Sequence, residues 1–520
     1  MRSKYLLLIV FLFFGQILIN AQTKVTTCEL TNLYQLTLSK SPTLERQKIK
    51  NRMAKVDKQS ASSRFDYQIF SDLSINRSGL NLFNADPRTD FVDGQIKTNN
   101  LSLSGGVQRI FRTGLTASVG IQYARIGDNL PFNSFNENVG AFISNNQTST
   151  SLSLTQPLLK GRGKYITTAN EKVANISIES QQYNTTFIAS NEVYSMTLGY
   201  WQYLAATKSL EIYQGNEERV SKVLEITNEL VKAEKKPMAD LLQIQADLKG
   251  KERQTINAQQ AVYSARQNLG RQIGFTTVES EGISLPENDF PNIDKIGTDL
   301  SLQDFLDVAY QNRNDLKAIN KSLEILGIYL DVANNNIKPQ LDLTGTVNYG
   351  GTDEGNGVDR FFSALGQQQG RNYQVGVGLK YLFPINNNAA EANQLNNQLQ
   401  YNDQEILLKN QIRNIELNVS IAYNNFLNSI EAVKKSEQAL IYHEEVFENE
   451  QFKFQNGLTT LLNLILFQER LTFAQLDFIQ NQQQFAVAIS NLRYETGTIF
   501  SEKQNGNTVN LDLFYSLPRK

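Results

Sequence analysis

The 520-residue sequence predicts an α+β protein made of two internal repeats, each of which combines a group of β-strands with very long α-helices. Three observations carry this prediction. Several segments alternate apolar and polar residues with a period of two, which places one set of side chains on each face of a sheet. Residues 164–232 and 387–455 contain no proline and only two glycines, as expected of long helices. A constant offset in residue number relates helical segments of the two halves, so that Leu248 aligns with Leu471.

The N-terminus has the features of a secretory signal peptide. Arg2 and Lys4 precede an apolar run that extends to Ile19, so we expect residues 1–21 to be a signal peptide rather than an anchor. No long apolar run follows residue 21, and no helix of the mature chain is therefore expected to cross a bilayer. An exported chain can still enter a membrane as a β-barrel. Cys28 is expected to be an ordinary unpaired residue.

The composition argues against several classes of protein. A net charge of −2 lacks the basic excess of a nucleic-acid-binding protein, so no nucleic acid is expected as a partner. One Cys and one His exclude a disulfide framework and leave no Cys/His cluster for zinc. The single histidine, His443, lies in a helical stretch and is expected to be solvated or packed. We therefore expect no enzyme activity, no cofactor and no metal site.

The order of segments is the same in both halves. The first repeat, residues 22–290, is predicted to contain a helix, strands within 65–156, a long helix at 164–232 and a helix at 238–271. The second repeat, residues 291–500, is predicted to contain a helix at 301–334, strands within 340–383, a long helix at 387–455 and a helix at 461–493. Residues 501–520 are expected to form a C-terminal tail.

The strands have the length and pattern of outer-membrane strands, although a half-buried sheet of a soluble sandwich alternates in the same way. The second repeat offers two strands, separated by a Gly-rich loop at 350–370. The first offers four, because Arg112-Thr113-Gly114 is typical of a tight turn inside an additional hairpin. Segments 78–97 and 126–148, rich in Asn, Asp and Gly, are expected to be loops on the extracellular side.

The long helices are predicted to pack against one another. A helix of about 68 residues is about 100 Å long, which is unusual for a globular core. One seam alternates spacings of four and three residues, as in a coiled coil. It consists of Leu408, Ile412, Ile415, Val419, Ala422 and Phe426.

On these residues the chain resembles the TolC-like outer membrane efflux protein family over essentially the whole mature sequence. Residues 457–468 look like the family's turn and tip helix, and Asp240-Leu241-Leu242-Gln243 is the counterpart in the first half. Arg313-Asn314-Asp315-Leu316 is similar to the segment that opens the family's second repeat. Segments 155–163 and 381–384 look like its transitions from strand to long helix.

The resemblance implies a homotrimeric outer-membrane β-barrel continued by a long periplasmic α-helical barrel. It further implies a channel component of a tripartite efflux or type I secretion system, in contact with outer-membrane lipid. A periplasmic adaptor and an inner-membrane transporter would dock near 233–239 and 455–460. Two strands per repeat give twelve per trimer, and we expect twelve; the additional hairpin would give eighteen if it joined the barrel. The sequence does not indicate which substrate is transported.

Five residues are candidates for the periplasmic tip and its aperture: Asp240, Gly457, Thr460, Asn463 and Leu466. The family's best-known members have acidic side chains where this chain has Asn463 and Leu466. A ring of leucines would gate by dewetting rather than by binding cations. Ordinary helix packing explains these residues equally well, and Asp240 fits an N-cap or first-turn carboxylate better than a gate.

Two other classes remain open from the sequence. A secreted coiled-coil structural or adhesive protein would explain the helices but not the strands in both halves. A secreted hydrolase would need a catalytic cluster that the sequence does not offer.

Overall fold

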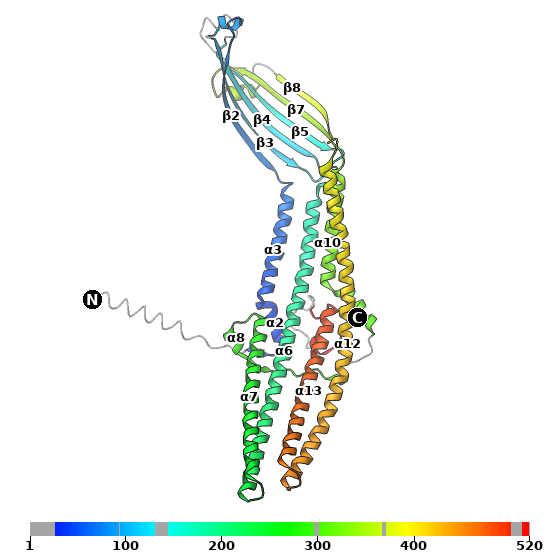
Figure 1. Cartoon of the computed structure of the whole chain (residues 1–520). Coiled ribbons are helices and arrows are strands. Elements are labelled where there is room, and N and C mark those ends of the chain that lie inside the picture. The colour runs from blue at the N-terminus through cyan, green and yellow to red at the C-terminus, as the bar shows by residue number, and fades with distance from the viewer. Residues whose placement is uncertain are drawn as a thin grey trace, which may run out of the picture. The chain divides into compact units, whose positions relative to one another are not determined.

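The computed structural model describes residues 26–92, 94–130, 144–295, 301–366, 371–500 and 512–518 (Figure 1). The predicted signal peptide and residues 501–511 of the predicted tail lie outside the described residues. The chain forms two compact units. One, the sheet unit, comprises residues 53–179 and 321–406, and the other, the helical unit, comprises 1–52, 180–320 and 407–520.

The sheet unit contains one antiparallel sheet of six strands in the order β2-β3-β4-β5-β7-β8 (Figure 1). The strands are β2 (Gln68–Asn81), β3 (Gln95–Ile110), β4 (Thr116–Asp128), β5 (Asn145–Pro157), β7 (Gln340–Glu354) and β8 (Arg371–Leu382). One row of apolar residues crosses all six in register: Ile69, Val107, Val119, Leu152, Val347 and Val375. The alternation read from the sequence is therefore confirmed as one continuous face.

The additional hairpin, β3 and β4, lies inside this sheet, so the count of two strands per repeat, on which the expected twelve was based, was wrong for the first half. The sheet of this chain contains six strands and not four. The physical reason is that β3 and β4 carry the same alternation as their neighbours and bond on both sides, which satisfies their backbone groups. The tight turn is confirmed: Gly114 has a φ of +93°, and its amide donates to the carbonyl of Phe111 at 2.8 Å.

The predicted loops are shorter than expected. β2 continues to Asn81 and β3 begins at Gln95, so strand occupies both ends of the segment 78–97, and a 3₁₀ helix, Pro87–Asp90, lies between them. In the segment 126–148, residues 131–143 lie outside the described residues. β7 enters the Gly-rich segment as far as Glu354, and a short helix, α11 (Arg360–Leu365), follows.

The helices fall close to their predicted bounds. They are α2 (Leu30–Lys40), α3 (Pro42–Ser63), α5 (Lys164–Thr167), α6 (Ala169–Lys232), α7 (Met238–Ile273), α8 (Thr277–Glu281), α9 (Leu302–Asn312), α10 (Asn314–Asn336), α12 (Asn388–Gln455), α13 (Leu461–Glu495) and α14 (Asp512–Tyr515). The single helix predicted at 301–334 is two helices, because the backbone of Arg313 is extended. Two short parallel strands, β1 (Thr26–Cys28) and β6 (Ile283–Pro286), were not predicted.

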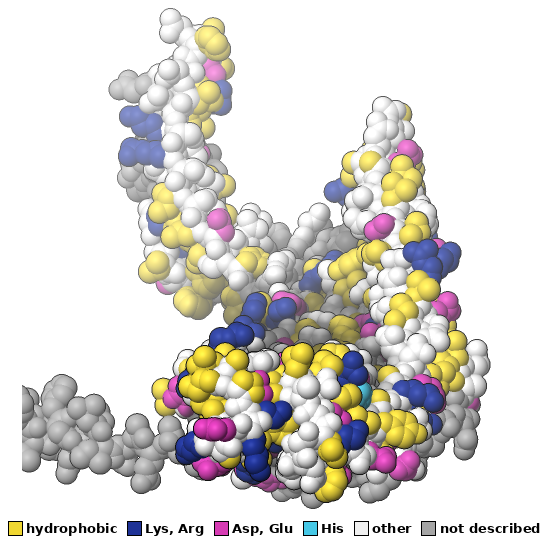
Figure 2. Space-filling view, turned by 60° about the horizontal axis from the view of Figure 1, so that its bottom comes forward, with side chains coloured by type: hydrophobic (Ala, Val, Ile, Leu, Met, Phe, Trp, Pro, Cys, Tyr) yellow, Lys and Arg dark blue, Asp and Glu magenta, His cyan; other side chains and the backbone are white. Residues whose placement is uncertain are grey.

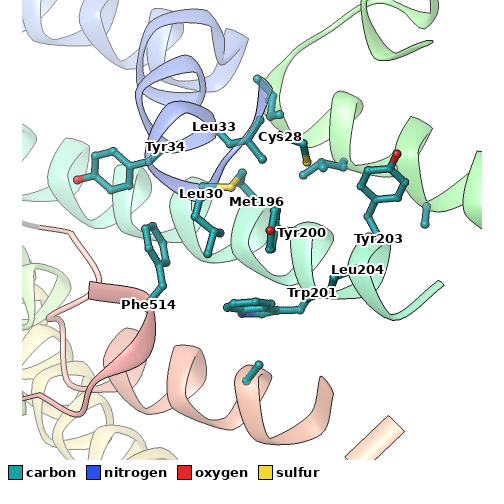
Figure 3. Packing of buried hydrophobic residues seen from close by; sticks show 14 of the residues in the cluster. Cys28, Leu30, Leu33, Tyr34, Met196, Tyr200, Trp201, Tyr203, Leu204 and Phe514 are labelled. Carbon is teal, nitrogen blue, oxygen red and sulfur yellow. The ribbon is translucent and has the colours of Figure 1, made fainter. Parts of the chain in front are cut away.

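The core of the helical unit is built around α6. Met196, Tyr200 and Trp201 are buried in one cluster that also contains Leu30 and Leu33 of α2 and Phe514 of α14 (Figure 3). Cys28 is also part of this core and forms no disulfide, as expected. The predicted seam of α12 packs into a second cluster with α9 and α13, where Ile415, Val419, Ala422 and Phe426 are buried.

Across the described ranges, no helix combines the length and the apolar character needed to cross a bilayer. In the same part of the chain, His, Cys, Asp and Glu side chains do not gather into a group that could hold a metal ion. His443 lies on α12 and is half-buried.

Candidate functional site

The two faces of the sheet differ sharply in chemistry. On one face, which we call the apolar face, large hydrophobic side chains are exposed on every strand, and Ile69 and Val375 are 83% and 70% exposed. On β8 this face runs from Tyr373 to Tyr381, about 26 Å along the strand. That length is close to the apolar band of about 25 Å on outer-membrane strands, and it ends in aromatic residues as their girdles do.

The opposite, polar face carries mainly Ser, Thr, Asn, Gln and Gly. Rows across the strands read, for example, Gln108, Ser118, Ser153 and Thr346. Phe70 is the aromatic side chain on this face, and its ring lies over Gly106, where a Cβ atom would come within 2.6 Å of it. The polar face therefore offers many neutral hydrogen-bonding groups and few charges.

The sheet has two open edges. β2 pairs only with β3, and β8 pairs only with β7, so the outer side of each edge strand is unpaired. In hydrocarbon each unpaired backbone group costs several kcal/mol, and a sheet with open edges does not persist there. Either the sheet lies in water or another strand covers each edge.

The turn between α12 and α13 is specified by its residues. Gly457 has a φ of +73°, and its amide donates to Phe454 while the amide of Leu458 donates to Lys453. This is the Schellman arrangement that ends a helix. Thr460 then caps α13, because its hydroxyl accepts from the amide of Asn463 at 3.2 Å.

The turn between α6 and α7 has the same geometry with different chemistry. Glu234, which the sequence offset between the two halves aligns with Gly457, has a φ of +58°, and the amide of Lys235 donates to Leu230 at 2.9 Å. Asp240 lies in the first turn of α7, where Pro237 is the N-cap residue, so the first-turn interpretation of Asp240 is the one the geometry supports. A carboxylate there interacts favourably with the helix dipole.

The start of α13 has a buried and an exposed side, and the remaining tip candidates, Asn463 and Leu466, lie on the exposed side. Leu461 and Leu464 are buried in a cluster that joins α6, α7, α12 and α13. Asn463 and Leu466 are exposed on α13, and Leu466 is 43% exposed. Hydrophobic side chains lie among basic and acidic ones at the end of the helical unit that carries the two turns (Figure 2). Both side chains are therefore accessible in the single chain, although Asn463 donates from Nδ2 to the hydroxyl of Thr459 at 3.4 Å.

Polar contacts also join α13 to α6 and α7 and fix the turn after α12, and the sequence did not indicate them. Gln468 donates from Nε2 to Oδ1 of Asn216 at 2.7 Å, and both residues are buried. The buried Lys251 pairs with Glu469 at 2.9 Å. Glu450 accepts from the hydroxyl of Thr459, which lowers the pKa of its carboxyl, with a further contribution from Lys453.

Comparison with known proteins gives a consistent result. Residues 305–498 match the family model described as "Outer membrane efflux protein". The outer membrane protein TolC of Vibrio cholerae is 22% identical over 330 residues, which is 62% of this chain and 71% of that protein.

Solved structures extend the likeness to nearly the whole chain. The outer-membrane channel OprN superposes with a TM-score of 0.66 at 14% identity, covering 90% of each chain. The outer membrane protein VceC of Vibrio cholerae superposes with a TM-score of 0.63 at 14% identity, covering 90% of this chain and 96% of that one. The second half of the chain therefore matches the outer membrane efflux protein family, and nearly the whole chain has a fold similar to those of OprN and VceC.

Proposed function

We propose that three copies of this chain close their sheets into one channel, which serves as the outer-membrane component of a tripartite efflux or type I secretion system. The family is one of outer-membrane channels and not of enzymes, and it places the chain in the outer membrane. The observation that carries the proposal is the open six-stranded sheet, apolar on one face and polar on the other.

Closure follows from the direction of the strands. All five neighbouring pairs are antiparallel, so β8 runs opposite to β2 and can pair antiparallel with β2 of another copy. Three six-stranded sheets would then give eighteen strands with no open edge. The apolar face would meet lipid, and the polar face would line a water-filled lumen.

The spacing of elements supports an internal duplication. Leu302, Asn314 and Gln340 begin α9, α10 and β7, and they follow the first residues of α2, α3 and β2, respectively, at one constant interval in the sequence. Leu461, the first residue of α13, follows Met238, the first residue of α7, at a shorter interval. The interval shortens where the first half carries the hairpin β3–β4. On this reading the hairpin was added to a shared plan of two strands per repeat.

The helical unit would continue the conduit in the periplasm, as a passive path for substrates that a transporter delivers. The turns at 233–237 and 456–460 are the ends of two helical hairpins, which makes them the natural place for an adaptor and an inner-membrane transporter to dock. The choice of substrate would then belong to the transporter.

Leu466 is the proposed constriction of this conduit. It is exposed on α13, shortly after the first turn that Thr460 caps, with Asn463 exposed beside it. A ring of three leucines would repel water, and the substitution Leu466→Ser would wet it. Higher single-channel conductance of this variant in planar bilayers is expected, and an unchanged conductance would reject the gate.

Disulfide trapping tests the closure directly. Ser74→Cys on β2 is combined with a cysteine at Asn372, Gln374, Gly376 or Gly378 of β8, all on the polar face. Within one chain these positions lie at opposite edges of the sheet, so a disulfide forms only between copies. One of the four pairs is expected to give covalent trimers on oxidation, whereas Ser74→Cys with Ser151→Cys of β5 is not.

The same preparations distinguish a channel from a fibre. A channel requires detergent for extraction and carries ionic current in planar bilayers. A chain released by salt as a monomer, with no current and no covalent trimer from any of the four pairs, would end the proposal in favour of a secreted structural protein.

A further inference from the structure

Three basic side chains meet at the loop end of the apolar face, opposite the end at which the chain enters β2 from α3. They are Arg77 of β2, Lys97 of β3 and Arg125 of β4. Arg125 lies opposite Leu101, and Arg77 lies opposite Asn99 in the next row. The three cations therefore occupy neighbouring positions on three adjacent strands, just beyond the apolar band.

These side chains line a cavity of about 450 Å³. Its lining includes the three cations and one carboxylate, Asp128, so its charge is positive. Asp128 already accepts a hydrogen bond from the amide of Leu130 at 3.0 Å. The floor is apolar: Ile75 and Leu101 line the cavity, and on the same face they lead to Leu73 and Leu103 in the next row of the band.

A loop with exposed apolar side chains adjoins the cavity. Arg125 donates from Nη2 to Oδ1 of Asn356 at 3.1 Å, and Ser144, which lines the cavity, donates to the same oxygen at 2.8 Å. Asn356 leads into α11, where Phe361 packs on the ring of Tyr123 at 5.4 Å between centroids. Phe362 of the same helix is 72% exposed.

We propose that this cavity binds the phosphorylated headgroup of an anionic lipid of the outer leaflet. Guanidinium groups recognise phosphate through paired N–H donors, and Lys97 adds a third positive charge. The acyl chains would lie over Ile75 and Leu101 and continue along the apolar face, while Phe362 of α11 would enter the same interface. The arrangement fits an amphiphile better than a free anion, because the cations adjoin a continuous hydrocarbon surface.

The inference rests on the outer-membrane location of the chain and on the proposed contact of its apolar face with lipid, but it does not depend on ion conduction. Binding is therefore measured apart from conductance, on the full chain as it assembles in detergent. The probe is diphosphorylated lipid A, detected as an adduct by native mass spectrometry. Inorganic phosphate and the zwitterionic lipid phosphatidylcholine are tested as competitors.

The variant that removes the site is Arg77→Gln, Lys97→Gln and Arg125→Gln together. Each basic residue near an anionic surface contributes several-fold, so the triple variant is expected to bind lipid A on the order of 100-fold more weakly. The matched control removes three exposed charges from α3 of the helical unit, with Arg46→Gln, Lys48→Gln and Lys50→Gln, and is expected to bind as the parent does.

Ligand variation makes the test independent of the folding of any variant. With the parent protein, removal of one phosphate from lipid A is expected to weaken binding, and neither phosphatidylcholine nor millimolar inorganic phosphate is expected to displace it. Equal binding of the diphosphorylated and dephosphorylated lipid would overturn the proposal. Displacement of lipid A by inorganic phosphate alone would assign the cavity to a free anion instead. An equal loss of lipid A binding in the control triple variant would show that the effect is one of general charge and not of this cavity.

Discussion

We expect the loss of Arg313 to destabilise the helical unit far more than the loss of an exposed cation. Arg313 lies between α9 and α10 and is 5% exposed. Its Nε and Nη2 donate to the two oxygens of Asp315 at 2.9 and 2.6 Å, and its Nη1 donates to the carboxylate of Glu495 at 2.7 Å. A single guanidinium thus ties the start of α10 to the end of α13.

The magnitude follows from what the substitution Arg313→Met leaves behind. The side chains of Asp315 and Glu495 are only 12% and 13% exposed, so two carboxylates would lose their common cation with little access to water. Burial alone would lower the pKa of Arg313, yet the two carboxylates raise it above its usual value, which marks the charged pair as favourable. Breaking a buried ion pair in this way costs about 3–5 kcal/mol.

Arg313→Lys separates charge from geometry. Lysine keeps the positive charge but lacks the fork that reaches both Asp315 and Glu495, so we expect an intermediate loss of about 1–3 kcal/mol. Thermal unfolding followed by circular dichroism, at one scan rate and protein concentration, gives the order parent, Arg313→Lys, Arg313→Met. The control is Arg46→Met on the exposed face of α3. If Arg313→Met melts within about 1 °C of the control, the pair does not stabilise the fold and the reasoning is wrong.

Three further predictions concern single groups. The left-handed backbone of Glu234 costs about 1 kcal/mol, and Glu234→Gly removes this strain. Hydrogen exchange of the following amide is therefore expected to slow about fivefold, whereas Gly457→Ala at the equivalent turn is expected to speed the exchange of the amide that follows it. Lys40, with the cap of α8, lowers the pKa of Glu279 to about 2. The contribution of Glu279 to stability is therefore complete above pH 4.5 and is lost as the pH falls towards 2. In urea titrations, Glu279→Gln is expected to differ in stability from the parent at pH 6 and to match it near pH 2. Burial, and then the charge of a nearby glutamate, raise the pKa of Cys28 to about 12, so N-ethylmaleimide at pH 8 is expected to label it only after unfolding, and rapid labelling of the native chain would contradict its burial.

Much of the fold could be predicted because its helices and strands are long, so that each hydrophobic period repeats many times within one element. The predicted helix at 387–455 is α12, Asn388–Gln455, and the seam at Ile415, Val419 and Phe426 is buried as the spacing required. The two-residue alternation gave all six strands, because each strand has one apolar face. It did not show that β3 and β4 share the sheet, since that depends on which strands pair and not on the pattern within a strand.

Short elements, and contacts between residues far apart in the chain, could not be predicted from the sequence. β1 and β6 are three and four residues long and pair Thr26 with Ile283, so neither segment contains a period. At the break between α9 and α10, the side chain of Arg313 binds the neighbouring Asp315 and also Glu495, which lies 182 residues further along the chain. Contacts of this kind depend on the assembled structure, in which residues far apart in the chain meet.

The same difference between local and non-local features applies to the residues of the two turns. Gly457 and Thr460 were identifiable because turn and cap chemistry is local. Glu234 adopts the same left-handed conformation against the preference of its residue type, so its alignment with Gly457 was the signal that could have identified it. The basic cavity was hidden because Arg77 and Arg125 come together only through the register of three strands.

The six strands per chain also bear on where the proposed channel is narrowest. Barrels of 16–18 strands leave an aqueous channel open, so a barrel of eighteen would not restrict flow. The hairpin β3–β4 widens the sheet without adding a long helix, because α6 and α12 are the long helices of the two halves. Conductance should therefore respond to Leu466→Ser at the tip and not to Phe70→Ser, which removes the aromatic ring from the polar face of the sheet. A larger response to Phe70→Ser would place the constriction in the barrel and would mean that the sheet closes with fewer strands than three complete copies supply.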